Sequence, residues 1–123
     1  MIDSSLSGRV IGAAIEVHKT LGPGLLESAY ELALEHELAL MGHLVERQKP
    51  VQLSYKGIEL GDALRLDLIV DDSLIVEIKS IEQIAPLHES QLLTYLRLTG
   101  APIGLLINFN VRVLKEGIRR ISN

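Results

Sequence analysis

The chain has 123 residues, enough for one domain spanning 1–123, and its 16 acidic and 12 basic residues give a formal net charge of −4. The absence of cysteine excludes disulfides and thiolate metal sites, and the acidic balance argues against a broad surface that binds nucleic acid by bulk charge. The start Met1-Ile2-Asp3-Ser4-Ser5 has no signal-peptide pattern, and no apolar run could cross a bilayer, so we expect a cytoplasmic protein with no membrane partner.

Two helices are expected in the first third of the chain. Apolar residues recur at helical spacing from about Ser5 to Leu21, and the run Gly22-Pro23-Gly24 should end that helix. A second helix is expected from about Leu26 to Met41, because its apolar residues again share one side. Gly42 then suits the position after the helix end.

Strands follow. Residues 51–55 alternate between apolar and polar, and a turn is indicated just after them at Lys56-Gly57. Residues 63–70 and 74–79 flank Asp71-Asp72-Ser73, which is the pattern of an antiparallel hairpin.

A crossover is expected in the last third. Pro86 suits the first turn of a third helix, which should stop at Gly100. The apolar run 103–109 is typical of a strand buried on both faces, and the tail 111–121 is expected to add an edge strand. Because a strand, a helix and a strand in this order imply a parallel pair, the fold class is α/β, with a mixed central sheet flanked by helices.

The hairpin register decides where its charged residues lie. With the three-residue loop 71–73, Val70 pairs with Leu74, and counting back sets Asp67 opposite Glu77 and Arg65 opposite Lys79. The residues 64, 66, 68 and 70 then form one apolar set. A two-residue loop would force a carboxylate into an apolar face, and side-chain period two makes that slip costly.

The expected position of Asp67 opposite Glu77 indicates a possible metal site. Like charges directly opposite destabilise a sheet, and a divalent cation would compensate. Mg²⁺ usually takes one or two carboxylates together with water and phosphate oxygens, which Asp67 and Glu77 could supply. Lys79, on the same face as Glu77, could orient a water or stabilise charge on a phosphate. The alternative is that these three residues form a solvated strand face with a compensating ion pair.

Further polar residues lie on the expected helices. Glu27 is in the first turn of the second helix, where the helix dipole favours acidic residues whatever their function. Tyr30 shares its side of that helix and could equally be a core aromatic. On the third helix His88, Gln91 and Tyr95 form one stripe at spacings of three and four, and the alternative is a partly exposed flank that meets water.

These residues together resemble a known pattern. Residues 24–30, Gly-Leu-Leu-Glu-Ser-Ala-Tyr, read GxxExxY, and nearly the whole chain resembles the GxxExxY protein family of the PD-(D/E)xK nuclease-like superfamily. Asp67 and the segment 77–79 match the superfamily's D…ExK core. Gln91-Leu92-Leu93-Thr94-Tyr95 matches the QxxxY motif of RecB-type nucleases. The resemblance implies a restriction-endonuclease-like fold.

The resemblance also implies roles. Asp67, Glu77 and the Ile78 carbonyl would bind Mg²⁺ or Mn²⁺, and Glu27 would add a direct or water-mediated contact. Lys79 would assist the attacking water. Gln91 and Tyr95 would orient Lys79 or the scissile phosphate.

The expected function is a metal-dependent nuclease, with DNA favoured over RNA as its partner. The alternative is a binding or adaptor protein with a nuclease fold and weak or no catalysis, which the acidic composition and the absence of a substrate-reading domain favour. A homodimer is also expected, because Leu93 is predicted on the outer side of the third helix and the tail could leave an open strand edge.

Overall fold

The computed structural model describes residues 5–123. The expectation that the chain starts without a signal peptide concerns residues 1–5, and four of these lie outside the described part. The helices are α1 (Leu6–Leu21), α2 (Glu27–Leu40), α3 (Pro86–Thr99) and the short 3-10 helix η1 (Leu114–Gly117). The strands are β1 (Val45–Tyr55), β2 (Ile58–Val70), β3 (Leu74–Lys79), β4 (Ile103–Asn108) and β5 (Ile118–Ser122). They form one sheet in the order β1-β2-β3-β4-β5.

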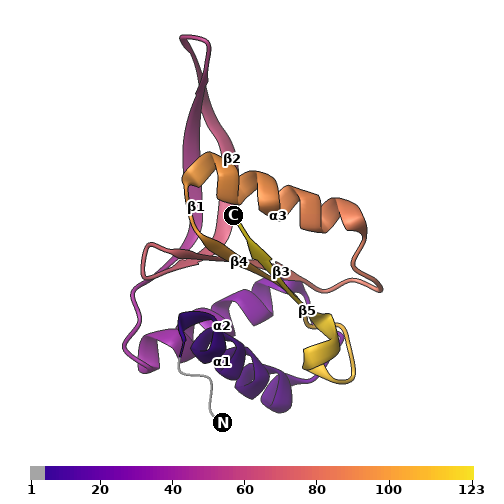
Figure 1. The fold of residues 1–123 in the computed structure, drawn as a ribbon. Helices are drawn as coiled ribbons and strands as arrows, with labels where there is room; N and C mark the ends of the chain where they lie inside the picture. Colours follow the sequence, from indigo (N-terminus) through magenta and orange to yellow (C-terminus); the bar gives the residue numbers. More distant parts are fainter. Residues whose placement is uncertain (1–4) are drawn as a thin grey trace.

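The sheet is mixed, as predicted. Strands β3 and β4 run parallel on either side of the α3 crossover, and the other neighbouring pairs are antiparallel. Helices α1 and α2 cover one face of the sheet and α3 covers the other (Figure 1). The predicted edge strand is confirmed, since β5 pairs with β4 at one end of the sheet. This architecture is an α/β, restriction-endonuclease-like fold.

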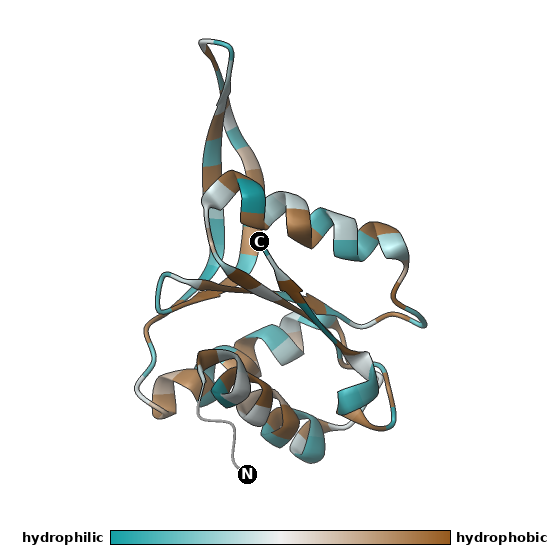
Figure 2. Cartoon of the chain, in the orientation of Figure 1, coloured by the Kyte–Doolittle hydropathy of each residue, from teal (hydrophilic) through white to brown (hydrophobic). Residues whose placement is uncertain are grey.

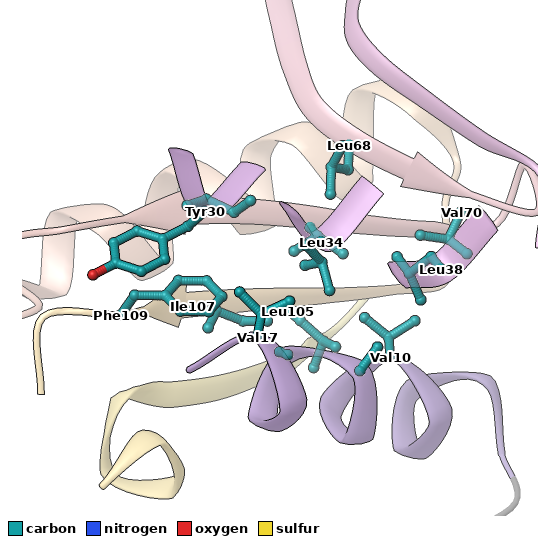
Figure 3. Packing of buried hydrophobic residues seen from close by; sticks show 14 of the residues in the cluster. Val10, Val17, Tyr30, Leu34, Leu38, Leu68, Val70, Leu105, Ile107 and Phe109 are labelled. Carbon is teal, nitrogen blue, oxygen red and sulfur yellow. The ribbon is translucent and has the colours of Figure 1, made fainter. Parts of the chain in front are cut away.

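The larger core lies between the sheet and the helices α1 and α2 (Figure 3). The predicted helical faces are confirmed, because Val10, Val17 and Leu34 are buried there. The Tyr30 ring stacks on Phe109 with ring centroids 4.5 Å apart, an arrangement that aromatic pairs favour when offset. The residue that directly follows β4 is therefore joined to α2 by an aromatic contact, in addition to the aliphatic packing of the strand itself.

The smaller core lies under α3. Leu92 and Leu96 of the helix pack with Ile75 and Leu106 of the central strands. The helix comes close to β4 at Gly104, where an added Cβ would lie 2.8 Å from a methyl group of Leu92. A larger residue at that position would force the Leu92 side chain to shift and so disturb the packing of α3 on the sheet.

The first two strands exchange faces midway, which the sequence analysis did not anticipate. Leu68 packs with the α1–α2 core, but Leu66, two residues earlier in β2, packs under α3. In β1, Val45 and Val51 divide in the same way. The prediction of one continuous apolar set through residues 64–70 was therefore wrong, because the strand turns over between Leu66 and Leu68.

Beyond this exchange β1 and β2 continue as a two-stranded arm, residues 52–63, which projects from the molecule past α3 (Figure 1). Both strands are longer than predicted. The turn at Lys56-Gly57 is confirmed, with φ of 46° and 85° at its two residues. Within residues 5–123, no helix combines the length and apolar character needed to span a membrane.

Candidate functional site

The predicted hairpin register is confirmed. Val70 pairs with Leu74, and the ladder continues through the pair Leu68 and Val76. It ends there, at the point where β2 exchanges faces. The predicted backbone pairs of Asp67 with Glu77 and of Arg65 with Lys79 are therefore not formed, although Arg65 still pairs with Pro50 of β1.

Beyond the last pair of the ladder, β2 and β3 are connected by hydrogen bonds between side chains and the main chain. The main-chain N–H of Ile78 donates to Asp67 Oδ2 at 2.8 Å, and the N–H of Asp67 donates to Glu77 Oε1 at 3.3 Å. The two carboxyl groups also hydrogen-bond to each other, with Glu77 as the donor when it is protonated. The two side chains thus lie side by side in the opening between β2 and β3.

Glu77 is buried and Asp67 is partly buried. Glu77 is only 5% exposed, and burial, followed by the charge of Asp67, raises its pKa to about 8. Burial also raises the pKa of Asp67, against the opposing hydrogen bond from Ile78. A solvated strand face is therefore the wrong description of Glu77, and a carboxyl pair of this kind needs either a proton or a cation.

Lys79 and Tyr95 lie near this pair. The charge of Lys79 lowers the pKa of both carboxyl groups, against the larger effect of burial. Burial raises the pKa of the Tyr95 hydroxyl, as do the charges of Glu77 and Asp67. Tyr95 is half-buried on the α3 core, whereas Gln91, one helical turn earlier, is exposed.

Glu27 reaches the end of β3 from the other side of the sheet. Its Oε2 accepts a hydrogen bond from the main-chain N–H of Ser80 at 3.3 Å, directly after Lys79. The Ser80 hydroxyl donates to the Leu25 carbonyl at 2.6 Å. The loop before α2 is thus attached to the residue that follows the ExK segment, and Glu27 holds that segment from outside.

Tyr30 completes this attachment. Its hydroxyl donates to the Gly22 carbonyl at 2.6 Å and accepts from the Leu25 N–H at 3.0 Å. Gly24 has φ of 95°, which a residue with a side chain rarely adopts. Both expectations for Tyr30 meet here, since its ring is a core aromatic and its hydroxyl shapes the loop beside Glu27.

Three polar residues that support the site were missed. Glu31 is only 5% exposed, and its charge raises the pKa of Asp67. Gln48 donates to Glu31 and, at 3.5 Å, to Asp67. Asn108 is 2% exposed and bonds Ile81 through both ends of its amide, which fixes the loop after β3.

The sequence carries signals for two of these residues, Glu31 and Asn108. Glu31 follows Glu27 by four residues, so both lie on one side of α2. Asn108 is the polar residue in the otherwise apolar run 103–109, and such a position usually has a hydrogen-bond partner. Gln48 precedes the alternating segment from which β1 was predicted, and nothing in its neighbourhood marks it.

The donor set fits a hard divalent cation. In the part of the chain that the structure describes, no three His, Asp or Glu side chains are grouped to hold a metal ion. Asp67 and Glu77 nevertheless supply two adjacent carboxylates, as many as Mg²⁺ usually takes from a protein. The Ile78 carbonyl, which follows Glu77 in the chain, is a main-chain oxygen of the kind that could join them. The raised pKa values mark a site where added positive charge would be stabilising.

Comparison with known proteins agrees with this geometry. A family model described as the PD-(D/E)XK nuclease superfamily matches residues 4–121. Neither the curated proteins nor the solved structures gave a significant match. The matched segment contains the D…ExK residues at the opening of the sheet as well as both helical layers. The chain therefore belongs to the PD-(D/E)XK nuclease superfamily.

Proposed function

We propose that the protein is a nuclease that hydrolyses phosphodiester bonds with Mg²⁺ or Mn²⁺, with DNA favoured over RNA as its substrate. The observation that carries this proposal is the contact of the buried carboxyl group of Glu77 with the partly buried carboxyl group of Asp67, beside Lys79. A merely structural strand face would gain nothing from holding two acids together where water is restricted. Superfamily membership supports the nuclease class.

The proposed roles follow from position. Asp67, Glu77 and the Ile78 carbonyl would hold the ion, which when bound supplies charge stabilisation and a water of lowered pKa. Lys79 would orient that water or neutralise charge on the phosphate. Tyr95 would contact the phosphate or Lys79, and Gln91 would reach outward from the same helix face toward the substrate. Glu27 would act through the Ser80 N–H or through water.

We also propose membership of the GxxExxY family within the superfamily. Each named position of the motif has a physical task in this fold. Gly24 allows the loop its positive φ, Glu27 holds the end of β3, and Tyr30 closes the loop through its hydroxyl. The motif would then serve to dock α2 against the ExK strand.

Cleavage assays test the proposed nuclease. Single-stranded DNA, duplex DNA and RNA are each incubated with the protein and with Mg²⁺ or Mn²⁺. We expect cleavage of at least one substrate, loss of cleavage in Asp67→Ala and retention in Asp62→Ala, a matched change at an exposed residue of the same strand. Cleavage that persists in Asp67→Ala, or that no metal supports, would refute the assignment.

The exposed apolar side chains of the arm favour a second function for the protein, the binding of a partner. Three of its apolar side chains are more than half exposed: Tyr55, Ile58 and Leu60, at 59%, 64% and 52%. At the base of the arm Val51 and Leu64 pack on the α3 core, so hydrophobic positions continue from the core into the projection (Figure 2). An exposed apolar surface of this kind marks an interaction site.

We propose a second copy of the chain as the occupant. The arm carries Lys56, Glu59 and Asp62, so its net charge is negative and does not suit phosphate. A groove of about 530 Å³ at its base is lined by apolar residues, including the half-exposed Leu98, and by Lys49 and Asp72. Two copies could each place an arm in the groove of the other, as two-fold symmetry allows.

Light scattering at high micromolar concentration tests this pairing. We expect a dimer for the wild-type chain and a monomer for Ile58→Lys. Lys115→Ala, a change on η1 away from the arm, should remain dimeric. A wild-type monomer at that concentration would exclude the arm as a self-association element.

A further inference from the structure

Gln48 of β1 lies beside Asp67 at the place where both strands exchange faces. Its neighbours Arg47 and Lys49 pair with Leu68 and Leu66, so Asp67 is its counterpart in the register. Gln48 has φ of 54°, a left-handed conformation that costs energy for a residue with a side chain. Such a conformation persists where the surroundings over-determine it, and it is common at functional sites.

The surroundings that hold Gln48 are two carboxylates from different elements. Its Nε2 donates to Oε1 and Oε2 of Glu31 on α2, at 2.8 and 2.9 Å. The same nitrogen lies 3.5 Å from Asp67 Oδ1. One amide group therefore bridges a helix carboxylate and a carboxylate of the proposed metal pair.

The chemistry of the partners fixes the direction of the amide. A glutamine nitrogen carries two hydrogens, and an ionised carboxylate can only accept. The nitrogen end must therefore face Glu31 and Asp67, with one hydrogen available for each. Turning the amide over would set its oxygen against two carboxylates.

Glu31 is in turn anchored. Its Oε1 accepts from Arg47 Nη1 at 3.2 Å, and Arg47 also lies 3.7 Å from Glu35, one helical turn further along α2. The buried charge of Glu31 is thus matched by a neighbouring cation, so it can serve as a fixed acceptor for Gln48. A chain of hydrogen bonds therefore connects Glu31 of α2 through Gln48 to Asp67 Oδ1. The other oxygen of Asp67, Oδ2, accepts from the main-chain N–H of Ile78.

We propose that Gln48 is a positioning residue, which with Glu31 as its anchor sets the orientation of the Asp67 carboxylate for the divalent ion. This inference rests on the proposed metal-dependent function. Residues behind metal ligands commonly act this way, and their loss typically lowers metal affinity or activity by about 10- to 100-fold. Neither Gln48 nor Glu31 belongs to the D…ExK or QxxxY segments, so the assignment enlarges the site.

The first test compares matched variants by calorimetric titration with Mn²⁺. Gln48→Met keeps the length of the side chain and removes its hydrogen bonds, so we expect Mn²⁺ affinity to fall by about 10- to 100-fold. Gln83→Met makes the same change at an exposed position outside the arm and its groove and should leave affinity unchanged. Equal affinity in Gln48→Met and the wild type would overturn the proposal.

A swap variant separates positioning from folding. Gln48→Glu alone places a third carboxylate beside Glu31 and Asp67 and should lower the melting temperature of the metal-free protein. The double variant Glu31→Gln/Gln48→Glu restores the hydrogen-bonded pair between positions 31 and 48 at unchanged net charge, so the melting temperature should rise above that of Gln48→Glu, although the carboxylate at position 48 still faces Asp67. It offers no donor to Asp67, so Mn²⁺ affinity should stay low.

The outcomes are distinct. Recovery of both melting temperature and Mn²⁺ affinity in the swap would show a structural role only and would overturn the inference. A wild-type protein that binds no Mn²⁺ would refute the proposed function, and the positioning role with it. Normal wild-type binding with unchanged Gln48→Met affinity would refute the positioning role alone.

Discussion

Asp67 and Glu77 are held together by reciprocal hydrogen bonds, since Asp67 accepts from the main chain that follows Glu77 while Glu77 accepts from the main chain of Asp67. These hydrogen bonds lie directly beyond Leu68 and Val76, the last pair of the β2–β3 ladder. The strands can therefore separate without leaving their N–H groups unpaired, and the opening between them is lined by carboxyl oxygens.

The metal-free protein should lose stability as pH rises toward 8. The ordinary glutamate pKa of 4.5 applies to the unfolded chain, and the folded pKa of Glu77 is about 8, so the folded state retains a proton that the unfolded chain has released. Its stabilising contribution is full below pH 4.5 and is lost as pH rises through about 8. Melting temperatures measured with a chelator from pH 5 to 9 should fall accordingly.

Glu77→Gln supplies the control for this pH dependence. It mimics the protonated group, so its melting temperature should lie closest to the wild type at pH 5 and exceed it by a growing margin up to about pH 8. Glu59→Gln, at an exposed residue of the arm, should retain the wild-type slope. A wild-type melting temperature that rises over the same interval would contradict the burial of Glu77.

Divalent ions should stabilise the fold. An ion that binds only the folded state adds about 2.7 kcal/mol to the free energy of unfolding at a hundredfold excess over its dissociation constant. Melting temperatures should rise with millimolar Mg²⁺ or Mn²⁺, and Glu77→Gln should blunt the rise because one ligand charge is lost. If neither ion shifts the wild-type curve, the adaptor role becomes the better account.

Lys79→Met should separate ion binding from chemistry. Lysine is assigned to the water and the phosphate, so we expect the rise in melting temperature with metal to remain. The cleavage rate should fall by about 10²- to 10³-fold, the usual cost of removing one group that stabilises transition-state charge. Cleavage at the wild-type rate would remove Lys79 from the mechanism.

Tyr30→Phe tests the loop before α2. The change deletes the hydrogen bonds to Gly22 and Leu25 while keeping the ring stack on Phe109. Two lost hydrogen bonds should cost about 1–3 kcal/mol in urea unfolding. Tyr55→Phe on the exposed arm should cost nothing measurable. Equal stability of both variants would show that the Tyr30 hydroxyl does not secure the loop.

Periodicity and turn chemistry were enough to predict much of this fold. The helices, the parallel crossover and the register of Val70 with Leu74 follow from local patterns that the tertiary structure respects. The prediction that Asp67 and Glu77 lie close together was derived from that register. The chemistry of D…ExK then made a metal site the natural prediction.

The rest depends on long-range geometry. The exchange of faces at Asp67 cannot be read from alternation, because a strand that turns over keeps its sequence pattern while its neighbours change. Glu31 and Gln48 are adjacent only after α2 docks on β1. A glutamine at positive φ has no local sequence signature, so its role becomes visible only with the fold.

The most direct test of the central claim is a calorimetric titration of Mn²⁺ into the wild-type protein and into Asp67→Ala. We predict one ion bound per chain in the wild type, loss of binding in Asp67→Ala and retention in Asp62→Ala. Absence of binding in the wild type, or equal binding in Asp67→Ala, would contradict a metal centre at the Asp67–Glu77 pair.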